Sequence, residues 1–134
     1  MSALLVVRAV GIWGVILVVA VLNGTARQFL LAPHLSERAA HQVSSIVLAG
    51  LILLISTVLV PFLGMLTTGQ LAGIGLMWTL LTVAFEFALG LLTGRSWDYM
   101  LADYNLPAGR LWVVVLAAVF VGPIVAARLR GTWR

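Results

Sequence analysis

Four long apolar stretches dominate the chain, and most polar residues lie in the segments between them. The stretches cover residues 3–22, 43–60, 71–92 and 111–127. The hydrocarbon core of a bilayer is about 30 Å thick, and a helix crosses it with about 20 residues that each add about 1.5 Å. The pattern therefore predicts an all-α membrane protein, with four transmembrane helices in an antiparallel bundle and a single domain over residues 1–134.

The connections between these stretches differ in length and in chemistry. Residues 61–70 form a short turn without charges, whereas residues 23–42 and 93–110 are longer and hold most of the polar side chains. With four spans, the two longer loops lie on one face of the membrane, and both termini lie on the other face with the short turn. The first stretch contains Arg8 and lacks a good small-residue cleavage site after it, so we expect a retained helix rather than a signal peptide.

A short amphipathic pattern lies in the last loop. Trp97, Met100, Leu101 and Tyr104 recur at steps of three and four residues, so they share one face of a helix. Gly94 is placed to end the third span just before this pattern. An apolar helical face next to a span predicts a short interfacial helix that lies in the headgroup layer.

Composition narrows the class of protein further. Hydrophobic residues make up 63% of the chain, charged residues 9%, and the mean hydropathy is +1.16. Because soluble domains have about a quarter of their residues charged, these values exclude a soluble globular domain, and they exclude a disordered chain as well. All eight basic residues are Arg and they are dispersed, so the net charge of +4 does not indicate nucleic-acid binding.

Signatures of common enzymes and metal sites are absent from the sequence. There is no Gly-x-Ser-x-Gly elbow, P-loop, His-Glu-x-x-His or dinucleotide glycine pattern, and there is no Cys. His34 and His41 do not have a metal-ligand spacing. Asp98 and Asp103 lie roughly 140° apart around a helix, so they do not converge as a catalytic carboxylate pair. The sequence favours a protein without catalytic residues, cofactor or metal, and a lipid-acting membrane enzyme is the least favoured alternative.

Orientation in the membrane depends on the arginines, and their numbers are equal on the two sides. The terminal side holds Arg8, Arg128, Arg130 and Arg134, and the loop side holds Arg27, Arg38, Arg95 and Arg110. The acids Glu37, Asp98 and Asp103 offset part of the loop-side charge. The basic C-terminal tail therefore favours termini in the cytoplasm.

Glu86 is the most informative polar residue, because it lies within the third apolar stretch about 9 Å from its loop-side end. A charged side chain at the centre of a span costs roughly 2.5–3.5 kcal/mol, so such a group usually faces the interior and has a partner. Gly75, Thr82 and Gly90 recur with it at helical steps and predict a small, polar stripe. The stripe indicates a proton or ion relay or a cation site, or else a structural carboxylate paired with an Arg or a Trp indole.

A second polar stripe enters the second span. Ser36 is a plausible N-cap, and Arg38, His41 and Ser45 follow at helical steps. His41 then lies at the membrane edge, where an imidazole can titrate near neutral pH or can hydrogen-bond a neighbouring loop.

The segment from Glu86 to Arg110 resembles a known sequence pattern. Glu86, Arg95-Ser-Trp-Asp-Tyr99, Asn105 and Gly109-Arg110 are similar to a motif of small bacterial membrane proteins of the ABC-transporter type IV family. In this chain the Glu is further from Trp-Asp-Tyr, and one extra residue precedes Gly-Arg. The rest of the chain is similar to small four-helix proteins of the bacterial inner membrane. The resemblance implies transport, and because the chain has no nucleotide-binding domain, any use of ATP would need a partner.

We therefore expect a small transport-related membrane protein or membrane subunit of the bacterial inner membrane, with a polar site around Glu86. The alternative is a structural or accessory subunit of a larger membrane complex, and the partners expected are the lipid bilayer and a second copy or a larger complex. The candidate residues for a ligand or ion pathway are Glu86, Arg95, Trp97, Asp98, Tyr99, Asn105, Arg110, His41 and Arg27.

Overall fold

The computed structural model describes residues 2–101 and 111–134, and within these ranges it contains seven helical segments. The long helices are α1 (Ala3–Ala26), α2 (Glu37–Leu59), α3 (Thr68–Leu92) and α5 (Trp112–Arg130). The short segments are η1 (Arg27–Leu31), η2 (Val60–Leu63) and α4 (Trp97–Leu101). The four long helices, two of them extended by η1 and η2, are long and apolar enough to cross a membrane, which confirms the four predicted apolar helices.

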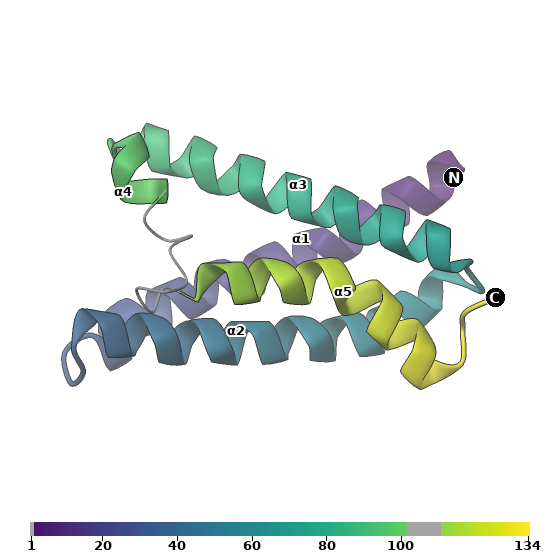
Figure 1. The fold of residues 1–134 in the computed structure, drawn as a ribbon, viewed down its shortest axis with the longest axis horizontal. Coiled ribbons are helices and arrows are strands. Elements are labelled where there is room, and N and C mark those ends of the chain that lie inside the picture. Colours follow the sequence, from purple (N-terminus) through teal and green to yellow (C-terminus); the bar gives the residue numbers. More distant parts are fainter. Residues whose placement is uncertain (1, 102–110) are drawn as a thin grey trace.

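α5 lies between α2 and α3 in Figure 1 and packs against both of them. α1 packs on α2 and, less extensively, on α3. Both ends of the chain lie at one end of the molecule, here called the terminal end, together with the turn between α2 and α3. The opposite end, here called the loop end, carries α4 and the connection between η1 and α2.

The first helix is longer than its apolar stretch. The sequence interpretation treats residues 23–42 as a loop, whereas the structure continues the helix to Leu31. The continuation is one π-helical turn, in which the Ala32 N–H donates to the Arg27 carbonyl at 2.8 Å. The prediction of a long loop here was therefore wrong for residues 23–31, because polar side chains at a membrane edge do not by themselves end a helix.

Local chain chemistry sets the other helix ends. The Ser36 hydroxyl accepts the Ala39 N–H at 3.1 Å, so the predicted N-cap of α2 is confirmed. Thr67 and Gln70 form a reciprocal capping box at the start of α3. Gly94 ends α3 with φ of 80°, and the Arg95 N–H donates back to the Gly90 carbonyl at 2.9 Å, as in a Schellman motif.

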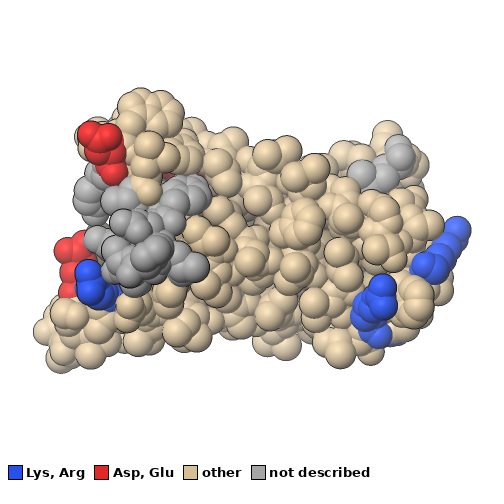
Figure 2. Space-filling view, in the orientation of Figure 1, with Lys and Arg blue, Asp and Glu red and all other residues tan. Residues whose placement is uncertain are grey.

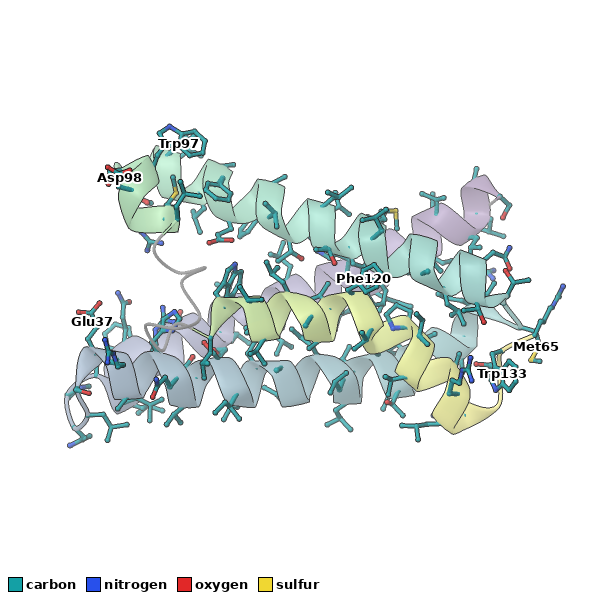
Figure 3. The ribbon with its side chains drawn as sticks, in the orientation of Figure 1. Glu37, Met65, Trp97, Asp98, Phe120 and Trp133 are labelled. Atoms are coloured by element: carbon teal, nitrogen blue, oxygen red, sulfur yellow. The ribbon has the colours of Figure 1, made fainter. Side chains whose placement is uncertain are left out.

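Small residues allow α5 to approach its neighbours closely. A Cβ built on Gly75 of α3 would lie 2.1 Å from the carbonyl oxygen of Phe120, and one built on Gly122 would lie 2.7 Å from Ser56 Oγ of α2. Figure 3 shows Phe120 where α5 passes α3. Close backbone approach through glycine is a common way for membrane helices to associate. The core therefore lies where α2, α3 and α5 meet, around fully buried side chains such as Ile52 and Val119.

Candidate polar site at the loop end

The interior face of α3 carries the candidate carboxylate. Trp78 is fully buried on this helix, and its indole N–H donates to the Ala9 carbonyl of α1 at 2.9 Å. Thr82 follows one turn later, Glu86 one turn after that, and the buried Gly90 one turn further still. Because these positions repeat every four residues, the half-buried Glu86 lies on the face that α3 turns towards its neighbours.

A hydrogen-bonded pair joins α1 to α3 one turn below Glu86. The Trp13 indole N–H donates to Thr82 Oγ1 at 3.0 Å, and the Thr82 hydroxyl donates to the Trp78 carbonyl at 2.7 Å. Sequence reasoning expects a Trp indole or an Arg as the partner of the carboxylate itself. The Trp13 indole is used by the neighbouring Thr82 hydroxyl, and this hydrogen bond joins α1 to α3 next to Glu86.

α4 folds back on the end of α3. The Trp97 ring stacks on Phe87 with centroids 5.4 Å apart, and the buried Met100 lies against Gly90, where an added Cβ would displace the Met100 side chain. Asp98 is exposed beside Trp97 at the tip of the loop end (Figure 3). The glycine at position 90 thus has an identifiable role, since it provides the surface on which the short helix rests.

A second polar cluster joins α1 and α2 at the same end. The Ser44 hydroxyl donates to Asn23 Oδ1 at 2.5 Å, and Ser45 Oγ lies 3.5 Å from Nδ1 of the half-buried His41. Asn23 was not among the residues expected from sequence. The available signal was an amide side chain at the end of an apolar stretch, but its partner is 21 residues away and no local pattern predicts the pairing.

The structure divides the candidate residues into two groups at the loop end. Glu86 and Trp97 lie on α3 and α4, with the exposed Arg95 between these helices and Asp98 next to Trp97. His41 and Arg27 lie on α2 and on the π-helical turn after α1, and both are half-buried. The remaining three are not placed: Asn105 and Arg110 lie outside the described residues, as does the side chain of Tyr99.

Charge is unevenly distributed between the two ends. On the face shown in Figure 2, acidic side chains are visible only at the loop end, and the charged side chains visible at the terminal end are all arginines. Within residues 2–101 and 111–134, no three His, Asp or Glu side chains are grouped as a metal site would require. The described polar groups of the loop end are hydroxyl, amide, imidazole, guanidinium and carboxylate groups, all of which can form hydrogen bonds. The imidazole and carboxylate groups can also take up and release protons.

Comparisons with known proteins find no relative. No protein-family model matches the chain, and neither a curated protein nor a solved structure matches it.

Proposed function

We propose that this chain is a small transport-related protein or membrane subunit, and that Glu86 is part of a proton or ion pathway that opens at the loop end. The observation that carries the proposal is the position of Glu86, a half-buried carboxylate on the interior face of a helix long enough to span a membrane. A carboxylate at that depth is costly, so such a group usually has a partner and often belongs to a proton or ion pathway. Thr82 and the second cluster around His41 supply further groups that exchange protons on the same half of the molecule.

The arrangement in the membrane is part of the proposal. The four long helices cross the bacterial inner membrane in antiparallel order, and α4 lies in the headgroup layer with Trp97 at the interface. Trp97 is 56% exposed, and its amphipathic ring suits this depth. The termini face the cytoplasm, as the unopposed arginines of the terminal end favour.

Purified protein in liposomes tests the pathway directly. We expect a pH-sensitive dye trapped in the liposomes to report proton entry when a potassium gradient and valinomycin set an inside-negative potential. Glu86→Gln should lower this flux at least about ten-fold, because an amide side chain does not ionise near neutral pH and therefore cannot release and rebind a proton as a carboxyl group can. Glu37→Gln makes the same change at an exposed carboxylate and serves as the matched control.

The folded state of each variant needs a separate measurement. Helicity by circular dichroism and the melting temperature in detergent should be close to wild type for both variants. An unchanged flux for Glu86→Gln, or no flux above empty liposomes for the wild type, would refute the proton pathway. A melting temperature that collapses only in Glu86→Gln would instead assign Glu86 a structural role.

The orientation can be measured with single cysteines, because the natural chain has none. A cysteine at the exposed position 37 marks the loop end, and one at the exposed position 65 marks the terminal end. Figure 3 shows Glu37 and Met65 at opposite ends of the molecule. A membrane-impermeant maleimide added to intact spheroplasts should label position 37 and spare position 65, and the reverse pattern would overturn the orientation.

The alternative function, an accessory subunit of a larger complex, has a distinct expectation. Such a subunit would retain a stoichiometric partner when it is extracted from its native membrane with surrounding lipid. The mass of the intact particle distinguishes the two, since an autonomous transporter would be found as a monomer or a homo-oligomer.

A further inference from the structure

Two hollows lie side by side at the terminal end, and they share Arg8 and Leu63. The larger, of about 540 Å³, follows α1 away from that end and opens to the outside of the molecule. Apart from Arg8 its lining is apolar: Gly11, Ile12, Val15, Leu59, Phe62 and Leu63. A Cβ built on Gly11 would meet no heavy atom within 4 Å, so the absence of a side chain there leaves the hollow open rather than making room for another helix of the chain.

The smaller hollow, of about 320 Å³, lies next to it and is polar. Its polar lining residues are Arg8, Arg134, Ser2 and Gln70, and its apolar ones are Leu4, Leu5, Leu63, Met65 and Leu66. The position of Arg134 is set by the backbone, because its N–H donates to the Leu66 carbonyl at 2.8 Å, while the Leu66 N–H donates to the Thr132 carbonyl at 3.1 Å. The C-terminal tail is thereby tied to the turn between α2 and α3.

The arginines of this end fall into two classes. Arg128 lies over the Trp133 ring at 4.6 Å, and Arg130 donates to the Thr57 carbonyl at 3.1 Å. The guanidinium groups of Arg8 and Arg134, in contrast, have no hydrogen bond or ion pair with any residue that the structure describes. Two unpaired guanidinium groups therefore line one polar hollow. The acidic side chains that the structure describes, Glu37, Glu86 and Asp98, lie in the half of the molecule nearer the loop end.

We propose that these hollows together form the binding site of one anionic phospholipid, with its phosphate between Arg8 and Arg134 and an acyl chain in the apolar groove along α1. The guanidinium fork matches phosphate oxygens in geometry and in charge. The order of the two hollows, polar at the end of the helix and apolar along its side, is also the order of headgroup and acyl chain in a bilayer leaflet. A helix from another protein would fill the apolar part but would leave both arginines without a counter-ion. The site is independent of the proposed pathway at Glu86.

Lipid retention measured by native mass spectrometry tests the site. The protein is released from nanodiscs that contain equal amounts of phosphatidylglycerol and phosphatidylcholine, and the lipids that remain bound are counted. We expect the wild type to retain one phosphatidylglycerol in preference to phosphatidylcholine. Arg8→Gln and Arg134→Gln should each lower this preference about five-fold, the factor expected for roughly 1 kcal/mol per basic residue near a lipid surface.

Matched variants separate headgroup recognition from packing of the acyl chain. Arg8→Lys keeps the charge and should keep most of the preference, whereas Arg38→Gln removes an exposed arginine of the loop end and should leave it unchanged. Gly11→Leu should reduce retention of both lipids because its side chain enters the groove. Gly50→Leu makes the same change at an exposed glycine of α2 with nothing within 4 Å of its Cβ, and it should have no effect.

Three results would overturn the proposal. The first is an unchanged phosphatidylglycerol preference in Arg8→Gln and Arg134→Gln. The second is unchanged lipid retention in Gly11→Leu. The third is a wild-type protein that forms a dimer, together with a Gly11→Leu variant that loses the second copy of the chain rather than the lipid. In that case the groove is an interface between two copies. The proton flux of Arg8→Gln should stay at the wild-type level, so failure of the lipid site and failure of the Glu86 pathway are distinguishable.

Discussion

Gly75→Ala is a sharp test of how α3 and α5 are held together. The new Cβ would lie 2.1 Å from the Phe120 carbonyl oxygen, and 3.0 Å and 3.3 Å from the carbonyl carbon and Cα of the same residue. All three atoms belong to the backbone of α5, so no side-chain rotation can relieve the overlap. Real Cβ contacts are essentially never shorter than 3.0 Å, and the helices must therefore separate by at least 0.9 Å at this point.

The size of the effect follows from that separation. A gap of 0.5–1 Å removes a quarter to a half of the dispersion attraction of an atom pair, which is worth about 0.1–0.2 kcal/mol at contact. If about 40 atom pairs across the interface lose a quarter of their attraction, the loss is about 1–2 kcal/mol. This lies within the range of about 1–3 kcal/mol for overpacked cores. We therefore expect Gly75→Ala to lower the free energy of unfolding by about 1–3 kcal/mol.

The assay is reversible unfolding in mixed micelles, with SDS as the denaturant and helicity as the signal. Gly50→Ala is the matched control, because it makes the same change within an exposed part of α2 where a Cβ meets nothing. That control should be neutral or slightly stabilising, since alanine is the better helix former by up to about 1 kcal/mol. If Gly75→Ala unfolds at the same SDS fraction as Gly50→Ala, α3 and α5 do not pack as described.

Two further predictions concern polar groups between the helices. In a double-mutant cycle, Trp13→Phe and Thr82→Val should show a coupling energy of about 0.6 kcal/mol, and at most about 1.7 kcal/mol. These are the values measured for hydrogen bonds between membrane helices. If the two changes have independent effects, the 3.0 Å hydrogen bond between these residues is excluded. Ser56→Ala should stabilise the protein by about 1 kcal/mol in the same unfolding assay, because Ser56 Oγ is buried without a hydrogen-bond partner among the described residues. Ser44→Ala should instead destabilise the protein, because it removes the hydrogen bond to Asn23. A destabilising Ser56→Ala would contradict the assignment of this hydroxyl as unpaired.

Sequence periodicity was a good guide to the helices, because the forces that define them are local. The Ser36 cap and the Gly94 termination each depend on residues within about five positions of one another, and each apolar stretch is continuous along the chain. The structure confirms the two helix ends and the four apolar helices. The end of α1 was misplaced for the same reason. Asn23, Thr25, Arg27 and Gln28 are polar and were interpreted as loop residues. The structure keeps them helical, and Asn23 accepts a hydrogen bond from Ser44 of α2, a contact that no local pattern reveals.

The candidate site was predicted less completely. The stripe that contains Gly75, Thr82 and Gly90 does face neighbouring segments, as its spacing indicates, and Glu86 lies within it. The identity of the neighbours was not predictable, because Trp13 and Thr82 are 69 residues apart and helical periodicity gives the face of a helix but not its partner. For the same reason the sequence did not show that Gly90 supports Met100, or that Gly11 faces open space.

The two ends of the molecule differ in a way that the arginine count alone does not reveal. Four arginines lie on each side of the sequence-based topology, so the count favours neither orientation. At the terminal end, however, two of the arginines are engaged by Trp133 and the Thr57 carbonyl, and the other two line one polar hollow. The negative surface potential of a cytoplasmic leaflet attracts such unopposed charge. The proposed lipid site and the proposed cytoplasmic placement of the termini are therefore consistent with each other. Together they would leave the loop end, with Glu86, to face the opposite side of the membrane.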